Sequence, residues 1–379
     1  SAAALRIGRM CRDLMDGEPG KVKVSYERLD ALATTHQSQG SDLGMTGGLL
    51  GFEADDKRLL NPDLYLEKEG IDLSVEVVDS GRKEANLYLL DLKNEKQHLR
   101  VEAVSSGGGM VEIIRIDDTP LSIRGDYHEL LVYSREKAFL DSLAKEVTWA
   151  SELFLHQGKL PFLEIRSRKQ ADKVWIRELK NQTPVFRIRI IGPVLPVLSG
   201  SKRKLPFTTC REMMKFTQGE TREAWQLALE YESARGDIPV EEVKTLMEDR
   251  YRVMRTAIDL GLKGTSYRDR IFGPQSLSYT KELKQGTLSK DETLHHVTRY
   301  VSALMEVKSS MGTIVAAPTA GSCGTFPGAV LGVADSLGKG EETIVRALLA
   351  GSLVGLFISS GATFSAEIGG CQAECGAGS

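Results

Sequence analysis

The hydrophobic pattern of this 379-residue chain changes its period close to residue 206, and this change constrains the fold more than any other feature. Before it, short apolar runs alternate with polar residues as in strands, whereas after Phe207 apolar residues recur at helical spacing. We therefore expect an α+β N-terminal domain, a small α/β module and an all-α C-terminal domain. The expected limits of these three parts are residues 1–133, 134–206 and 207–379.

The N-terminal part reads as a helix followed by a strand-rich sheet. The helix is expected over residues 2–15, and a loop leading into a second helix over residues 31–51. The run Gly107-Gly108-Gly109 lacks the following helix of a dinucleotide fingerprint, so a turn between strands is one reading of it. The expected strands are Lys21–Tyr26, Leu73–Val78, Ala85–Leu92, His98–Val104, Met110–Ile116 and Leu130–Tyr133.

The middle part mixes one charged helix with several strands. The helix is predicted over Arg135–Leu155, and the strands over Phe162–Arg166, Val174–Arg177 and Val185–Ile191. The stretch from Gly192 to Pro206, with its prolines and its Lys202–Lys204 charge run, predicts a solvated linker.

Three helices stand out in the C-terminal part. One is predicted over Glu241–Leu262 and ends at Gly264, and another over Thr287–Ser309, with Ser289 and Asp291 in capping positions. The third, Ile344–Ser360, is almost purely apolar, so we expect it to be buried on every side. Its strongly apolar run is too short to favour a membrane span.

Charge and cysteine usage exclude several classes of protein. The 49 basic and 52 acidic residues are mixed along the chain and give a net charge of −3, which predicts no nucleic-acid or anionic-membrane partner. The five cysteines are scattered, which favours a reducing cytoplasm over a disulfide framework. The adjacent His295 and His296 point about 100° apart on a helix and cannot share a metal. Cys11 and Cys210 are interpreted as inert thiols.

Two glycine-rich segments flank the apolar helix, and they carry the strongest functional signal. They are Ala317-Pro318-Thr319-Ala320-Gly321-Ser322-Cys323-Gly324 and Glu367-Ile368-Gly369-Gly370-Cys371-Gln372-Ala373-Glu374. Glycine loops let backbone approach a small ligand closely. A Cys371 thiolate beside backbone N–H groups would be stabilised as an anion and become a good iron ligand. Cys323 is either a residue that supports the site or a small residue that fills buried space. Cys375 is not expected to be a metal ligand.

These segments resemble the bacterial iron–sulfur-dependent L-serine dehydratases (L-serine ammonia-lyases), with a beta domain fused ahead of an alpha domain. The resemblance covers residues 1–133 and 207–379, and residues 134–206 are similar only to an altered ACT-like segment or a linker. It rests on Ser1–Arg9, Gln39–Asp42, Gly47–Phe52, Asp55-Asp56, Gly107–Gly109, Met311–Gly321 and Glu367–Glu374.

The resemblance implies a lyase that removes water from L-serine and releases pyruvate and ammonia. Its cofactor would be a [4Fe–4S] cluster held by three cysteines, with one iron acting as a Lewis acid. Cys371 matches the first of these cysteines, and the remaining ligands are expected beyond residue 379. By the same resemblance, the chain is expected to be a fragment at both ends, and its C-terminal domain to be catalytic.

The resemblance also assigns site residues. Where the family has Gly-His-Gly-Thr-Asp, this chain has Ser38-Gln39-Gly40-Ser41-Asp42; glutamine cannot transfer a proton, and His36 is near enough in sequence to compensate. The residues expected to be catalytic are Gln39, Asp42, Pro318, Thr319 and Gly321. Those expected to bind substrate are Gly40, Ser41, Thr319, Ala320, Gly321 and Ser322.

Two other readings remain open. One is a related cluster-dependent lyase acting on L-cysteine or another small amino acid, and the other is a non-catalytic amino-acid-sensing partner. The expected partners are L-serine and a second copy of the chain in a homodimer.

Overall fold

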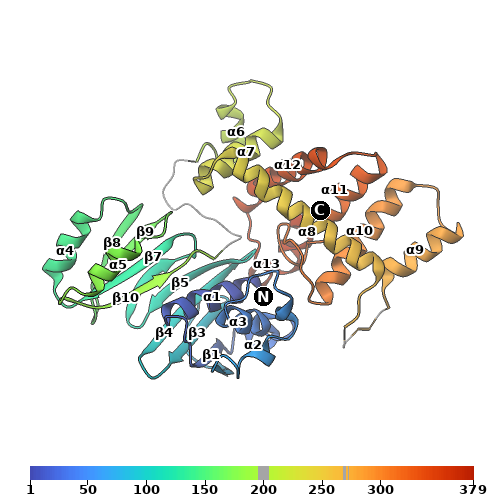
Figure 1. Ribbon diagram of the computed structural model, residues 1–379. Coiled ribbons are helices and arrows are strands. Elements are labelled where there is room, and N and C mark those ends of the chain that lie inside the picture. Colours follow the sequence, from blue (N-terminus) through green and yellow to red (C-terminus); the bar gives the residue numbers. More distant parts are fainter. Residues whose placement is uncertain (195–204, 268–269, 272) are drawn as a thin grey trace. The chain divides into compact units, whose positions relative to one another are not determined.

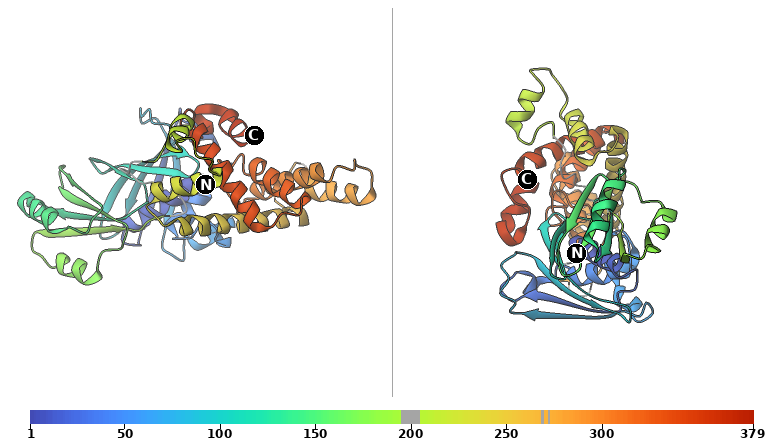
Figure 2. Two further views of the ribbon diagram at one scale, coloured as in Figure 1. Left: turned by 90° about the horizontal axis from the view of Figure 1, so that it is seen from above. Right: turned by 90° about the vertical axis from the view of Figure 1, so that its left-hand side faces the viewer.

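The computed structural model describes residues 1–194, 205–267, 270–271 and 273–379, without the side chains of residues 366, 367, 371 and 375. The chain divides into unit 1, Ser1–Leu198, and unit 2, Ser199–Ser379. In the described residues the strands lie in unit 1, drawn blue to green, while unit 2, yellow to red, is helical (Figures 1 and 2). The expectation of a first part that mixes helices with strands and of a helical last part is confirmed. Most of the predicted linker, including Lys202–Lys204, lies outside the described residues.

Unit 1 begins with a six-stranded sheet, called sheet A, in the order β2-β1-β3-β4-β5-β6. Strands β1 and β2 are parallel, and the other neighbours are antiparallel. Its strands are β1 Lys21–Glu27, β2 Asp72–Val78, β3 Leu87–Lys93, β4 His98–Gly107, β5 Met110–Ile116 and β6 Thr119–Ile123. The accompanying helices are α1 Ala2–Leu14, α2 Leu32–Thr35, α3 Ser41–Leu49, η1 Lys57–Leu60 and η2 Pro62–Tyr65.

Helix α1 contacts α3 and strands of both sheets of unit 1. It packs closely on α3 because Gly8 and Gly48 lie at the contact, where a Cβ on Gly48 would come within 2.2 Å of the Leu5 carbonyl oxygen. The Arg6 guanidinium is buried and donates to the carbonyls of Val194, Gly109 and Arg124 at 2.9, 2.8 and 3.0 Å. All three glycines of Gly107–Gly109 have positive φ in the β4–β5 hairpin, so the turn reading of this run is confirmed.

A second, antiparallel sheet follows, called sheet B, in the order β10-β7-β9-β8. Its chain order is β-α-β-β-α-β, with an apolar core between one face of the sheet and the helices. The elements are β7 His128–Ser134, α4 Lys137–Glu146, β8 Glu152–His156, β9 Phe162–Ser167, α5 Lys173–Lys180 and β10 Val185–Ile191.

Three local predictions in this part of the chain are wrong. Residues 130–133, expected to continue the first sheet, lie in β7 and pair with β9 and β10. Residues 174–177, expected as a strand, lie in α5, because Asp172 caps that helix by accepting from the Val174 and Trp175 amides. The helix expected over 135–155 ends at Glu146 and is followed by β8.

Unit 2 contains two apolar clusters that share α8 and α12. Helix α10 packs closely on α11, where a Cβ on Gly328 or Gly332 would meet the Val301 or Val297 backbone at 2.7 Å. The Asp291 cap of α10 is confirmed, since its carboxylate accepts from the Leu294 amide. The helices are α6 Cys210–Phe216, α7 Ala224–Gly236, α8 Val240–Lys263, α9 Gln275–Gln285, α10 Glu292–Ser309, α11 Thr325–Ser336 and α12 Glu341–Ser359.

Helix α12 is buried on one side only, contrary to the expectation of burial all round. Ile344, Leu348 and Leu353 face the core, whereas the Val354 side chain is 58% exposed. By length and composition alone, this helix meets the criteria for a membrane span. A core helix meets them too, so a single case is weak evidence; α12 packs on α7, α8 and α11.

Candidate functional site

The first candidate region is the loop that precedes α11 in unit 2. Thr319 and Ser322 are buried, and their hydroxyl oxygens lie 3.0 Å apart. The Thr319 amide donates to Ser322 Oγ and the Ser322 amide to Thr319 Oγ1, both at 3.2 Å. The Ala317–Pro318 peptide bond is cis. These reciprocal bonds between Thr319 and Ser322 fix the loop. The backbone of Ala320 and Gly321 lies between these two residues.

The C-terminal segment packs on this loop. It consists of α13 Ala366–Gly369, η3 Gly370–Ala373 and α14 Cys375–Gly378. The Glu374 carboxylate approaches Gly321 so closely that a Cβ there would lie 2.1 Å from its Cδ atom, and a Cβ on Gly378 would lie 2.7 Å from the Ser322 Cβ. The two glycine-rich segments of the sequence are therefore in contact, through residues that allow close approach.

Cys323 lies directly behind the loop. It is 1% exposed, and burial raises the pKa of its thiol to about 11; Lys308 and a backbone hydrogen bond oppose this shift, and Glu374 adds to it. Its Sγ atom lies 4.0 Å from Met305 Sδ. Its position behind the loop is compatible with both interpretations of Cys323, a residue supporting the site and a small buried filler.

The second candidate region is in unit 1, between α2 and α3. His36 Nδ1 lies 2.6 Å from Asp42 Oδ2, and the Tyr26 hydroxyl donates to Asp42 Oδ1 at 3.4 Å. The Tyr26 ring also packs on the imidazole, with the ring centroids 4.9 Å apart. Burial, Tyr88 and Asp42 raise the pKa of the Tyr26 hydroxyl, which therefore stays protonated as a donor. Asp42 and Tyr26 thus orient His36 from two sides.

Backbone geometry explains why His36 reaches Asp42. Gly40 has a left-handed conformation, with φ 69°, and stands at the N-cap of α3. The Ser41 amide donates to the His36 carbonyl at 2.8 Å, which turns the chain back on itself. Ser41 is buried, while Gln39 is exposed and its side-chain amide donates to Thr35 Oγ1.

The structure thus brings together some of the predicted residues within each unit. Asp42 joins His36, and Thr319 to Ser322 join Glu374, whereas Gln39 points to Thr35. Tyr26 and the role of Glu374 at Gly321 were not foreseen. The alternation of β1 could have signalled that Tyr26 faces inward with Val22 and Val24, but not that it meets Asp42.

Other histidines and cysteines of the described part lie outside these two regions. His295 is buried and bonded to the Tyr279 hydroxyl and the Ser289 carbonyl. Cys11 is buried, with its thiol pKa raised to about 12 by desolvation, and Cys210 is exposed. No group of three or more possible metal ligands occurs among the described side chains. Cys371 and Cys375 lie outside them.

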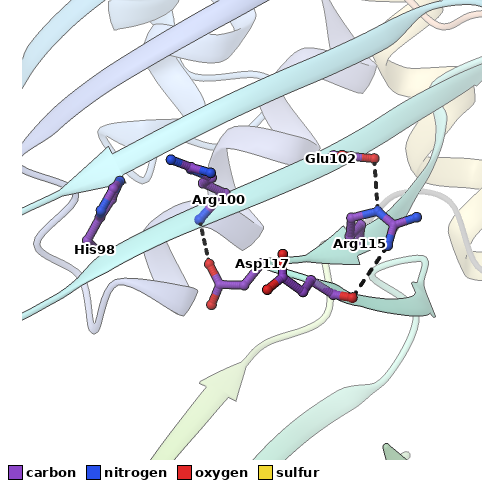
Figure 3. Close-up of a pocket in the computed structure, with 6 residues that line it drawn as sticks. His98, Arg100, Glu102, Arg115 and Asp117 are labelled. Carbon is purple, nitrogen blue, oxygen red and sulfur yellow. Dashed lines mark hydrogen bonds and ion pairs between the residues drawn. The ribbon is translucent and has the colours of Figure 1, made fainter. Parts of the chain in front are cut away.

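A surface hollow on sheet A is lined by charged residues that bond to one another. Figure 3 shows Arg115 bonded to Glu102 and the Arg100 backbone amide bonded to Asp117. His98 pairs with Asp91 on the neighbouring strand at 2.9 Å. Because these charges are already compensated and exposed, the hollow is not assigned to the functional site.

Comparison with known proteins gives matches to two kinds of chain. Residues 208–379 match the family described as "Serine dehydratase alpha chain". The chain is also 32% identical over 137 residues to "Probable L-serine dehydratase, beta chain" of Bacillus subtilis (strain 168), which covers 36% of this chain and 61% of that protein. It is 34% identical over 140 residues to the "Probable L-serine dehydratase, alpha chain" of that organism, covering 37% and 46%.

A third relative is "L-serine dehydratase" of Streptomyces coelicolor, 27% identical over 194 residues, which cover 49% of this chain and 41% of that protein. The chain spans less than two thirds of the length of each of these relatives. The family match is confined to residues 208–379, the part of the chain that holds most of unit 2. This one polypeptide is therefore similar in one stretch to an L-serine dehydratase beta chain and in another to an alpha chain.

Proposed function

We propose that the protein is an L-serine ammonia-lyase, which removes water from L-serine and releases pyruvate and ammonia. The contact of Glu374 with Gly321 carries this proposal, because it joins the two segments on which the resemblance to the family most depends. The similarity to chains named L-serine dehydratase supports the choice of substrate.

In unit 2, the loop Pro318–Ser322 is the proposed binding site for the amino acid. The Thr319 and Ser322 hydroxyls are occupied with each other, so the backbone of Ala320 and Gly321 is the surface left for a ligand. The Glu374 carboxylate beside Gly321 can pair with an α-ammonium group, a charge-assisted contact. A small amino acid fits such a loop because glycine admits close backbone contact.

In unit 1, the His36–Asp42 pair is the proposed proton-transfer group. An aspartate that accepts from one imidazole nitrogen fixes the tautomer and leaves the other nitrogen to take or give a proton. Gly40 and Ser41 position this pair through the turn before α3. The Gln39 side chain neither gains nor loses a proton near neutral pH. Its predicted catalytic role is therefore restricted to hydrogen bonding.

The cofactor proposal concerns a [4Fe–4S] cluster with Cys371 as one ligand. Such a cluster, when bound, supplies a Lewis-acidic iron. Among the described side chains no group of three possible metal ligands occurs, so the other ligands of such a cluster remain a prediction. The roles given above therefore involve only this chain's own residues. We also propose a homodimer in the cytoplasm.

Serine turnover by the full-length protein tests the activity. The protein would be purified without oxygen and assayed for pyruvate from L-serine, with D-serine and L-cysteine as comparison substrates and with iron and sulfide measured in parallel. We expect stereospecific pyruvate release from L-serine and four irons per chain. Turnover of L-cysteine alone would support the related lyase. Serine binding without turnover, by a protein that contains no iron, would support the sensing partner and overturn the proposal.

A further inference from the structure

The outer edge of sheet A at β2 is open. Strand β2 pairs with β1 on one side, and in the described part of the chain no strand pairs with it on the other side. The opposite edge strand of the sheet, β6, is held through its Ser122 carbonyl, which accepts from Arg166 of β9. Neither of the candidate regions above includes a residue of β2.

Hydrogen bonds at the two ends of β2 show which of its backbone groups point outward. The Asp72 amide donates to the Gly20 carbonyl at 3.0 Å, and the Val78 carbonyl accepts from the Arg28 amide at 2.8 Å. In a parallel ladder, alternate residues direct both their N–H and their C=O groups to the same neighbouring strand. The residues that face β1 are therefore Asp72, Ser74, Glu76 and Val78. The residues whose N–H and C=O groups point away from the sheet are Leu73, Val75 and Val77.

The three outward-facing residues also carry apolar side chains on the core face of the sheet. In the strand register they lie beside Val22, Val24 and Tyr26 of β1, which are fully buried in the core of unit 1. Val75, the middle residue of β2, is nevertheless 37% exposed, because it stands at the edge. A strand added at this edge would therefore gain backbone hydrogen bonds and apolar contacts from the same residues.

The charged side chains of β2 lie on the other face and have partners on β1. Lys21 lies 3.7 Å from Asp72, and Lys23 lies 2.8 Å from Glu76, whose carboxylate also accepts from Ser25 Oγ at 2.9 Å. Proteins commonly protect an open edge with Lys or Pro, and the sequence Asp-Leu-Ser-Val-Glu-Val-Val of β2 contains neither. Because its two carboxylates are compensated within the sheet, the strand has little that would prevent pairing.

We propose that β2 is the dimerisation edge of this protein and that it pairs with β2 of a second copy, antiparallel and centred on Val75. This inference locates the homodimer proposed above and rests on that part of the proposed function. In this register Val75 lies opposite its own counterpart, and Leu73 lies opposite Val77 on each side of the two-fold axis. Each of these pairs exchanges two hydrogen bonds, because residues with outward-facing groups meet as hydrogen-bonded pairs.

The charge pattern of β2 favours this register and a second copy as the occupant. In the centred register Ser74 lies opposite Glu76, and no two carboxylates are directly opposite each other. Centring the pair on Glu76 instead would place two copies of that carboxylate face to face, and centring it on Ser74 would place Asp72 opposite Glu76. Like charges directly opposite each other destabilise a strand pair. The two-fold interface uses both β2 edges, so the assembly closes as a dimer and does not extend into a fibre.

The first test replaces Val75 by Cys in the full chain. The Cα atoms of a hydrogen-bonded antiparallel pair are about 5.5 Å apart, which a disulfide can span. We expect oxidation of Val75→Cys to give a covalent dimer linked at this position, identified by mass spectrometry of the joined peptides because Cys210 is also exposed. Asp72→Cys, on the same strand and exposed, is the matched control. Its two copies would be about 20 Å apart and should not be joined.

A second variant measures the affinity of the dimer. Val75→Pro removes an outward-facing amide, which an edge strand tolerates, and leaves the hydrogen bonds to β1 in place. We expect the dissociation constant, measured by analytical ultracentrifugation, to rise at least about tenfold, because each copy loses one hydrogen bond across the interface. Val75→Thr keeps the amide and the shape of the side chain and should remain as dimeric as the wild type.

The outcomes separate the location of the interface from the existence of the dimer. A dimer that gives no link in Val75→Cys and is unaffected by Val75→Pro would overturn this inference and leave the homodimer itself in place. A wild-type chain that is monomeric at every concentration tested would overturn both. Neither result bears on the turnover of L-serine, which is measured separately.

Discussion

The two candidate regions hold their functional groups in opposite ways. In unit 1, an ion pair and a ring contact between side chains position His36, so the arrangement depends on Asp42 and Tyr26. In unit 2, the absence of side chains at Gly321 and Gly378 allows Glu374 and the C-terminal segment to approach the loop. The first region depends on charge and hydrogen bonding, whereas the second depends on volume. The two should therefore respond differently to isosteric and to small-to-large substitutions.

The largest effect is expected from replacing His36 by Gln. This substitution preserves approximate size and hydrogen bonding but removes proton transfer, so turnover of L-serine should fall by about 10²- to 10⁴-fold. Asp42→Asn should also lower turnover. The asparagine can present its NH₂ group to His36 Nδ1, which would then be held as an acceptor, in the wrong tautomer. Pyruvate release at several pH values is the measurement. His98→Gln, which breaks a similar but exposed pair with Asp91, is the control and should leave turnover within about twofold.

A smaller effect is expected from adding one methyl group at Gly321. The new Cβ would lie 2.1 Å from the Glu374 carboxyl carbon, so the carboxylate has to move away from the loop. A displacement of about 1 Å at a reacting centre can reduce turnover by about 10²-fold. The temperature of thermal unfolding should change little, because the Glu374 side chain is only partly buried and can move toward solvent.

Gly355→Ala is the matched control for that substitution. Gly355 lies within α12, and a Cβ there would meet nothing within 4 Å. Alanine should therefore leave turnover unchanged and stabilise the helix by about 0.5–1 kcal/mol. If Gly321→Ala were as active as Gly355→Ala, the steric account of unit 2 would be wrong.

The smallest effect is expected at Cys323, measured by alkylation rather than by turnover. Because burial raises its thiol pKa to about 11, very little thiolate is present at pH 8, and access is blocked as well. The exposed Cys210 should be alkylated much faster in the folded protein, and mass spectrometry of the two peptides separates them. Equal labelling rates before unfolding would show that the loop opens readily.

Short-range signals explain which predictions succeeded. The glycine hairpin at 107–109 and the Asp291 cap follow from local backbone geometry, and both are confirmed. The strand expected at 174–177 failed because a local cap at Asp172 outweighed the β-branched residues that follow it. The assignment of β7 to sheet B could not be foreseen, since its alternation is equally compatible with either sheet and only pairing with β9 and β10 decides it.

The functional residues divide in the same way. The sequence pointed to Asp42 and to the loop from Pro318 to Ser322. It could not show that His36 is the residue that pairs with Asp42, or that Gln39 donates to Thr35 instead. The ionic contacts of Glu129 and Glu164 on sheet B were also not predicted, because both residues occupy what look like ordinary polar positions of strands. These contacts arise only when β7 and β9 bring both glutamates onto Arg166.

The sequence by itself determined where the chain changes from strands to helices, where α10 is capped and where the glycines at 107–109 form a turn. These properties depend on residues within a few positions of one another, so a linear pattern contains them. Only the tertiary structure decided that Glu374 lies at Gly321, that α12 exposes Val354 and that Arg166 gathers three carboxyl groups. Each of these depends on contacts between distant segments, whose geometry is set by the packing of the whole unit.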